Sequence, residues 1–298
     1  MSILLDEKTS VLVQGVTGKE GLRALADMRA YGTRVACGVT PGKGGHVADG
    51  APVFDTVREA VAAFPETTVS AIYVPPLAAK AAIMEAIEAR IPLITVMTEK
   101  IPLRDAAYCL AVAQERGVRV LGPGSLGCLV PGIGRVGVVG GPLVEEIYAP
   151  GPIGVISRSG GMTNELSWLV RRAGLGQSAA VHVGGDFLIG TTYADLLRMF
   201  ERDDATKAVV LYGEQGAPYE REIVELLSRR EFTKPLAVHI GGAFAASMPE
   251  GAVIGHAGAI VATGQSAADK SAALREAGAL VAERFDDLVE LVKHSARV

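Results

Sequence analysis

The sequence predicts an α/β protein with two doubly wound domains, each a mostly parallel sheet covered by helices. Three observations lead to this prediction. The 298 residues exceed what most single hydrophobic cores reach and suit two domains of about 150 residues each. Short β-branched runs alternate with longer stretches rich in Ala, Leu and Glu, which is typical of parallel sheets with covering helices. The alternation stops at residues 148–152 and then starts again.

In the first half, strands and helices follow from the periodicity of apolar residues. Helical spacing predicts helices between the strands, and the last one ends in Arg116-Gly117, which suits a helix C-terminus electrostatically and sterically. Strands are expected at residues 11–13, 34–39, 71–74, 93–97 and 119–121, and helices at residues 19–31, 57–64, 78–90 and 103–116.

The segment 148–152 (Tyr-Ala-Pro-Gly-Pro) is the most linker-like part of the chain. Its two prolines and its glycine interrupt both periods just before a new strand. We therefore place the boundary there, which gives domains of residues 1–149 and 150–298. In the second domain, strands are expected at residues 153–156, 179–183, 208–212, 235–240 and 280–281, with helices between them.

Composition and charge exclude several classes of function. A net charge of −4 gives no general attraction to nucleic acid or to an anionic membrane surface. The three cysteines lack Cys-x-x-Cys spacing, which disfavours a zinc site and a disulfide framework. No apolar run reaches the roughly 18 residues that span a bilayer. We expect a cytoplasmic protein without a targeting segment, a metal site, or a nucleic-acid or membrane partner.

The first strand runs into a glycine-rich turn. Gly15, Gly18 and Gly21 lie between this strand and the first helix, where backbone N–H groups and a helix N-terminus can meet a phosphate. The spacing differs from the Gly-x-Gly-x-x-Gly of dinucleotide sites. The alternative, that the glycines only permit tight packing, stays open on this motif alone.

A second loop favours the phosphate interpretation. Lys43 lies between glycines in the loop after the second strand. The loops after parallel strands meet at one carboxyl edge of the sheet, so Lys43 can reach a phosphate at the first turn. Loops 74–76 and 97–99 are expected to line the same edge and to contact an adenine or pantetheine arm.

His256 is the candidate nucleophile of the second domain. Small residues surround it in Gly255-His-Ala-Gly-Ala259 and leave room for a phosphoryl group, although an isolated loop histidine is usually structural. Glu214 follows a strand and can orient an imidazole nitrogen. The turn 157–161 opens a helix near Met162, whose amides and dipole suit a phosphate. The other histidines are expected to be structural.

These motifs resemble the alpha subunit of succinyl-CoA synthetase, and the likeness extends over essentially the whole chain. It implies an N-terminal Rossmann-like CoA-binding domain followed by a flavodoxin-like ligase domain that carries a phosphohistidine. The order and spacing of the motifs are specific to this family. They lie at residues 14–18, 38–45, 73–75, 98–99, 157–160, 184–186, 213–214 and 255–259.

The resemblance also implies roles for individual residues. His256 is implied to be phosphorylated, and Glu214 to orient it. CoA binding is implied for Thr17, Gly18, Lys19, Glu20, Lys43, Pro75, Met97, Thr98 and Glu99. Phosphate or acid binding is implied for Ser125, Ser159, Gly160, Gly161 and Asn164.

In the resembled family, phosphohistidine passes its phosphoryl group to a carboxylate, and the CoA thiol then displaces phosphate from the acyl phosphate. ATP or GTP with Mg²⁺ sits on a separate ATP-grasp beta subunit. This chain has no Walker-type Gly-x-x-x-x-Gly-Lys-Ser/Thr motif. The resemblance therefore implies a beta subunit partner, in an αβ or α2β2 assembly, and a dicarboxylate or tricarboxylate substrate.

Three segments depart from the family pattern. Residues 122–127 read Gly-Pro-Gly-Ser-Leu-Gly where the family usually has Gly-Pro-Asn-Cys-Pro-Gly, and residues 161–165 read Gly-Met-Thr-Asn-Glu in place of Thr-Leu-Thr-Tyr-Glu. A basic stretch is replaced at residues 245–252. The 157–162 segment and the lost basic stretch resemble ATP-citrate lyase and citryl-CoA synthetase, and a wider, more polar pocket would suit a bulkier acid. The acid stays open between succinate, citrate and malate.

Two other hypotheses belong to different classes. A CoA-binding regulatory protein that has lost the chemistry is suggested by the altered loops at residues 122–127 and 161–165. An NAD-dependent dehydrogenase built on the first domain is disfavoured, because that domain lacks the dinucleotide glycine spacing.

Overall fold

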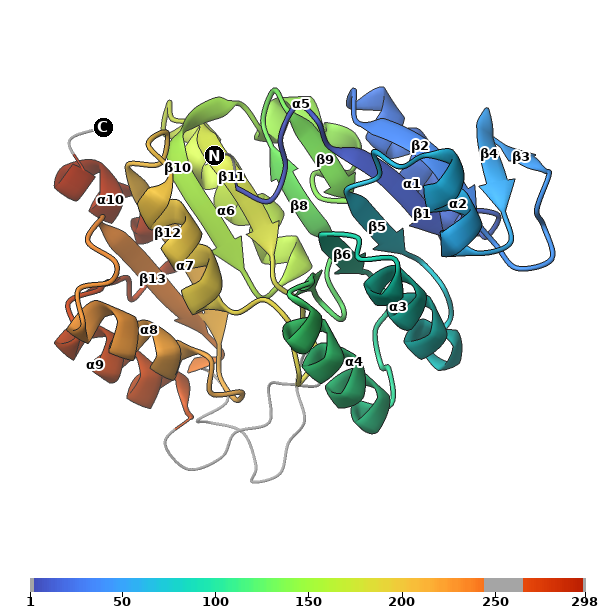
Figure 1. Ribbon diagram of the computed structural model, residues 1–298. Coiled ribbons are helices and arrows are strands. Elements are labelled where there is room, and N and C mark those ends of the chain that lie inside the picture. Colours follow the sequence, from blue (N-terminus) through green and yellow to red (C-terminus); the bar gives the residue numbers. More distant parts are fainter. Residues whose placement is uncertain (1–2, 244–264, 297–298) are drawn as a thin grey trace.

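The computed structural model describes residues 3–243 and 265–296. Two sheets lie side by side, with helices on both faces of each (Figure 1). No helix in these two ranges is long and apolar enough to cross a membrane.

The first sheet has the strand order β3-β4-β2-β1-β5-β6-β7. β3 is antiparallel to β4, and the other neighbours pair in parallel. Numbered along the chain, the parallel strands read 3-2-1-4-5-6, which is the Rossmann order. The elements are β1 (Ser10–Gln14), α1 (Lys19–Ala30), β2 (Arg34–Val39), β3 (Val47–Ala48), β4 (Ala51–Phe54), α2 (Val57–Ala63), β5 (Val69–Ile72), η1 (Pro76–Ala78), α3 (Ala79–Glu88), β6 (Leu93–Val96), α4 (Leu103–Arg116) and β7 (Arg119–Leu121).

The second sheet has the order β14-β13-β12-β10-β11-β8-β9. Its parallel part reads 2-1-3-4-5, the flavodoxin-like order, and β8 runs antiparallel to both β11 and β9. The elements are β8 (Gly127–Val130), β9 (Gly134–Gly137), η2 (Gly141–Leu143), α5 (Val144–Ile147), β10 (Pro150–Ser157), α6 (Gly160–Arg172), β11 (Gln177–His182), α7 (Tyr193–Arg202), β12 (Ala208–Glu214), α8 (Glu220–Ser228), β13 (Leu236–Gly241), α9 (Ala267–Glu276), β14 (Leu280–Val281), η4 (Phe285–Asp287) and α10 (Leu288–Ala296).

Most predicted elements appear within a few residues of their predicted bounds, and the differences have physical causes. β5 ends at Ile72, two residues before the end of the predicted strand 71–74, because two prolines follow Val74 and bias the preceding backbone away from the sheet. β3, β4, β8 and β9 were not predicted. The second sheet thus takes strands from residues 127–137, ahead of the expected boundary, while β10 begins directly after that boundary.

One continuous core joins the two domains. Leu25 and Met28 of α1 belong to the same buried cluster as Val130 and Val136 of β8 and β9, and each such buried side chain stabilises the fold by about 1.5–3 kcal/mol. Thr33 adds two hydrogen bonds of 2.8 Å with the backbone N–H and C=O of residue 135. β8 and β9 lie between β11 and the first sheet (Figure 1), so this packing fixes how the two sheets face each other.

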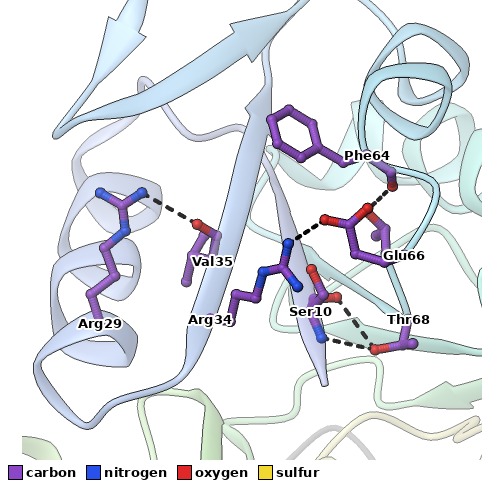
Figure 2. A network of polar contacts seen from close by, with 8 residues as sticks. Ser10, Arg29, Arg34, Val35, Phe64, Glu66 and Thr68 are labelled. Carbon is purple, nitrogen blue, oxygen red and sulfur yellow. Dashed lines mark hydrogen bonds and ion pairs between the residues drawn. The ribbon is translucent and has the colours of Figure 1, made fainter. Parts of the chain in front are cut away.

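Side chains link the amino-terminal ends of the strands in the first sheet (Figure 2). The Ser10 N–H donates to Thr68 Oγ1 at 3.0 Å, and Arg34 forms an ion pair with Glu66. Arg29 Nη2 donates to the Val35 carbonyl at 3.2 Å. The predicted ligand-binding residues lie at the opposite, carboxyl edge.

Candidate active site

Most of the predicted site residues that the structure describes lie at the carboxyl ends of the two sheets, beside the points where the strand order reverses. These points fall between β1 and β5 in the first sheet and between β10 and β12 in the second. In open α/β sheets, ligands bind in the crevice outside such points. Thr17 and Pro75 follow β1 and β5, Ser159 follows β10, and Glu214 ends β12.

The turn between β1 and α1 uses its glycines in two ways. A Cβ at Gly21 would lie 2.3 Å from the Gly15 carbonyl oxygen, so Gly21 lets the helix pack directly on the turn. Gly18 is the N-cap of α1 and provides no side-chain cap. The first N–H groups of a helix have no intrahelical partner, and Gly18, Lys19 and Glu20 are exposed. Gly21 thus fits the packing interpretation, and phosphate binding at Gly18 stays a prediction.

The loop after β2 is tied to this turn. The Thr17 N–H and hydroxyl lie 3.4 and 3.2 Å from Thr40 Oγ1. The Lys43 N–H donates to the Thr40 carbonyl, and the Gly44 N–H donates to Asp55 Oδ1 at 2.8 Å. Lys43 is exposed. The backbone thus fixes the turn that carries this cation beside the start of α1.

The loops after β5 and β6 are joined to each other. Thr98 Oγ1 donates to the Val74 carbonyl at 2.7 Å. Met97 and Thr98 are half-buried, whereas Pro75 and Glu99 are exposed. The structure therefore brings the predicted residues of these two loops to the same edge.

Residues 122–126 bridge the carboxyl ends of the two sheets. The Gly124 N–H donates to the Thr98 carbonyl at 3.0 Å, and the Gly124 carbonyl accepts from Gly185 N–H at 3.3 Å. A Cβ at Gly124 would lie 3.3 Å from Glu99 Cγ and 3.5 Å from the Asp186 nitrogen. The loop after β6 and the loop after β11 therefore both contact Gly124.

Ser125 and His182 hold this bridge together. Ser125 is 1% exposed; its hydroxyl donates to the His182 carbonyl and accepts from Gly127 N–H at 2.8 Å. His182 Nδ1 accepts from Leu126 N–H at 2.6 Å, and Nε2 lies 2.8 Å from the Arg158 carbonyl, where it donates. His182 is a buried structural residue, as predicted. Ser125 has a structural role here, and its contact with a ligand stays a prediction.

The turn after β10 differs slightly from the expected one. α6 begins at Gly160, before the predicted start near Met162, because Ser159 is the N-cap and its hydroxyl accepts from Met162 N–H at 3.5 Å. A Cβ at Gly160 would lie 2.4 Å from Leu126 Cδ1, whereas a Cβ at Gly161 meets nothing within 4 Å. Gly160 is needed for packing, and Gly161 leaves the turn open.

Asn164 is engaged within the chain. Its Oδ1 accepts hydrogen bonds from the Gly140 N–H and the Tyr148 hydroxyl, both at 2.9 Å. These bonds tie α6 to the segment around η2 and α5. The predicted role of Asn164 in binding the acid stays a prediction.

Glu214 ends β12 and is half-buried. Lys270, which the sequence analysis did not single out, donates from Nζ to the Glu214 carbonyl at 2.7 Å, to the Ala217 carbonyl at 2.8 Å and to the Glu220 carboxylate. Burial lowers the pKa of Lys270, but three oxygen acceptors around Nζ favour the ammonium form. Glu220 and Lys270 are far apart in sequence, so no local pattern indicates the pair.

His256 falls outside the described residues, in the segment 244–264. On the described sides of this segment, β13 ends at Gly241, and the Gln265 carbonyl accepts from Gly216 N–H at 3.0 Å. In the described ranges, no group of three or more His, Cys, Asp or Glu side chains is placed to hold a metal ion.

Comparison with known families identifies both halves of the chain. Residues 6–100 match a CoA binding domain, and residues 150–294 match a succinyl-CoA ligase like flavodoxin domain. The chain is 43% identical over 295 residues to succinate–CoA ligase [ADP-forming] subunit alpha 1 of Archaeoglobus fulgidus, and this match covers 98% of each chain. The chain belongs to the succinate–CoA ligase alpha-subunit family.

Other relatives of this chain are named for different acids. Malate–CoA ligase subunit alpha of Methylorubrum extorquens is 43% identical over 287 residues, covering 95% of this chain and 94% of the relative. The ATP citrate lyase of Methanothrix soehngenii, solved with citrate and coenzyme A, matches with a TM-score of 0.92 at 29% identity. That match covers 99% of this chain and 50% of the lyase, so this chain spans about half of the lyase chain.

The comparisons confirm the predicted family, the α/β fold class and the acid–thiol ligase class. They also confirm that the first domain is of the CoA-binding type, and this replaces the dehydrogenase hypothesis. The domain boundary and the roles of individual site residues stay predictions.

Proposed function

We propose that this chain binds CoA at the carboxyl edge of its first sheet and carries a phosphohistidine at that of its second, as one subunit of a nucleotide-dependent carboxylate–CoA ligase. The observation that carries the proposal is the bridge through Gly124, which lies against Glu99 on one side and Asp186 on the other. A thiol at the first edge and a phosphoryl group at the second can then act on one acid held between them.

The turn between β1 and α1 fits a CoA phosphate. The uncapped N-terminus of α1 offers N–H groups and the positive end of a helix dipole, and Lys43 adds a cation from the neighbouring turn. The Thr17–Thr40 contact keeps the two turns together. We assign CoA contacts to Thr17, Gly18, Lys19, Glu20 (through its backbone N–H), Lys43, Pro75, Met97, Thr98 and Glu99.

The chemistry proceeds through His256. One imidazole nitrogen accepts a phosphoryl group while the Glu214 carboxylate accepts a hydrogen bond from the other nitrogen and fixes the ring. A carboxylate oxygen of the acid then attacks phosphorus, the N–P bond breaks and an acyl phosphate forms. The CoA sulfur attacks the acyl carbon, the acyl C–O bond breaks, and phosphate leaves with the thiol proton. Ser159, Gly160 and Gly161 hold the phosphate at the start of α6.

A partner supplies the phosphoryl group. We assign ATP or GTP with Mg²⁺ to an ATP-grasp beta subunit in an αβ or α2β2 assembly, because the chain belongs to an alpha-subunit family. The substrates of such a ligase are soluble metabolites, and we place the complex in the cytoplasm.

The acid is a dicarboxylate or tricarboxylate, bound near Ser125 and Asn164. Relatives named for succinate and malate favour a dicarboxylate, and the likeness to an ATP citrate lyase favours citrate as the second candidate. Screening succinate, malate and citrate for CoA-thioester formation by the copurified two-subunit complex identifies the acid. Turnover of none of the three would remove this assignment.

Labelling tests the proposed phosphohistidine. The two-subunit complex, incubated with γ-labelled ATP and Mg²⁺, should place acid-labile label on this chain, and His256→Asn should abolish it. Label that survives His256→Asn, or an unlabelled wild-type chain, would refute the mechanism. A CoA-induced thermal shift without label would instead support the CoA-binding regulatory protein.

A further inference from the structure

The turn after β12 and the start of α9 form one hydrogen-bonded unit. The Gly216 N–H donates to the Gln265 carbonyl at 3.0 Å. Lys270, in the second turn of α9, reaches back to the Glu214 and Ala217 carbonyls at 2.7 and 2.8 Å. The residue that ends β12 and the first described residues after segment 244–264 are therefore held against each other.

Lys270 and Glu220 form a buried ion pair. The side chain of Lys270 is 4% exposed and that of Glu220 is 3% exposed, so water does not replace their mutual contact. Removing one member of a buried ion pair leaves an uncompensated charge, whereas replacing both with apolar residues is often tolerated. The pair can therefore be removed as a unit while the fold is kept.

Gly213, the residue before Glu214, leaves the space that the Glu220 carboxylate of this pair occupies. A Cβ at Gly213 would lie 2.8 Å from Glu220 Oε1 and 2.7 Å from Ile240 Cδ1. The Gly-Glu sequence at the end of β12 thus leaves space for the Glu220 carboxylate directly beneath the strand end. Glu220, at the start of α8, in turn accepts from Lys270.

We propose that Lys270 is a positioning residue for phosphoryl transfer: its two bonds to the carbonyls of residues 214 and 217 fix the strand end that presents the Glu214 carboxylate. This inference rests on the proposed function of Glu214 and His256. Lys270 does not touch substrate. It acts through the backbone of the turn, and Glu220 serves to keep it in place.

The test compares three forms of the full chain in complex with the ATP-grasp beta subunit: wild type, a double variant and a control. The double variant Glu220→Leu/Lys270→Met removes both charges and both backbone bonds. Lys234→Met is the matched control, because Lys234 Nζ also donates to two carbonyls, of Phe200 and Asp203, at 2.6 Å. That lysine lies ahead of β13, at the opposite edge of the same sheet.

The rate of label transfer from γ-labelled ATP to the chain should fall by at least about tenfold in the folded double variant, because small misplacements of catalytic groups cost rate steeply. The KM for CoA should stay unchanged. Lys234→Met should be labelled at nearly the wild-type rate.

A folded double variant labelled as fast as wild type would overturn the inference while leaving the proposed function intact. An equal loss of rate in Lys234→Met would also overturn it, because the effect would then be one of general stability. An unlabelled wild-type chain would refute the proposed function and the inference with it. Thermal unfolding of each variant reports whether it is folded.

Discussion

The two glycine-rich turns of this chain have the same layout but differ in how the N-terminus of the following helix is capped. Each follows a strand beside a reversal of strand order and leads into a long helix. At α1 the N-cap is Gly18, without a side-chain hydrogen bond, whereas at α6 the N-cap is Ser159, whose hydroxyl accepts from the third residue on. One turn thus leaves its amides open, and the other partly satisfies them from within the chain.

The difference indicates different tasks for the two turns. An uncapped N-terminus suits a phosphate that belongs to a ligand and brings its own oxygen atoms to the amides. A capped N-terminus is already ordered, which suits a phosphoryl group that is present only during part of a reaction cycle. The packing glycines differ too: Gly21 meets backbone, whereas Gly160 meets the end of the Leu126 side chain.

Gly21→Ala should have the largest effect. The new Cβ would lie 2.3 Å from the Gly15 carbonyl oxygen, and overpacking of this kind costs about 1–3 kcal/mol, more than the roughly 1 kcal/mol that Ala gains over Gly in a helix. Urea unfolding should show a net loss of stability and weaker CoA binding. Gly161→Ala, which meets nothing within 4 Å, is the control and should lose no stability.

Gly18→Ser should make the first turn resemble the second. The backbone of Gly18 is extended, with φ −76° and ψ 158°, so serine fits and can cap α1. Stability should rise by a few tenths of a kcal/mol, while the Kd for CoA should rise about tenfold as the cap competes for the amides. Calorimetric titration with CoA measures this; unchanged affinity would show that these amides do not bind its phosphates.

Lys43→Met should weaken CoA binding by about fivefold, the size expected for one exposed charge near a phosphate. The loss should shrink as salt is raised, because screening weakens exposed charge pairs. Titration at low and high ionic strength checks this. Lys8→Met, a lysine at the other end of β1, should leave the affinity unchanged.

The smallest effect concerns pH and one buried thiol in each sheet, Cys37 in β2 and Cys128 in β8. Burial raises the pKa of Cys37 and of Cys128 to about 12. With a raised pKa, the folded chain keeps the thiol proton at pH values where the unfolded chain has lost it. The free energy of unfolding is therefore unaffected by this thiol below its unfolded pKa of about 8.5, and it falls as the pH rises from there towards 12. Cys128→Ala should flatten this fall by about 0.7 kcal/mol between pH 8 and 9.

Urea unfolding at the two pH values measures that slope for Cys37→Ala and Cys128→Ala. Because one core joins both domains, both variants should flatten the same single transition. Two separate transitions, each affected by one variant, would contradict the shared core.

The sequence was sufficient for most parallel strands and insufficient for the antiparallel ones. Alternating β-branched and helical runs predicted every strand of the two parallel orders except β4, because that pattern is local. β8 and β9 are short and begin with glycine, and glycine gives no strand signal. β8 pairs with β11, about 50 residues away in sequence, and β9 pairs with β8.

Site prediction shows the same division. Thr17, Lys43 and Thr98 fall on one edge because parallel strands place their following loops together. Lys270 was missed, since a lysine on a helix is usually solvated and its burial depends on Glu220. Asn164 was predicted to face a ligand, but only the fold reveals the two hydrogen bonds that its amide oxygen already accepts.

A chase experiment tests the central claim, that one edge delivers phosphate to an acid lying beside CoA at the other. The two-subunit complex is labelled with γ-labelled ATP, freed of nucleotide, and mixed with CoA and whichever of succinate, malate or citrate it turns over. Label should leave the chain as inorganic phosphate, with one thioester formed for each phosphate released. Thioester formed while the label stays on the chain would contradict it.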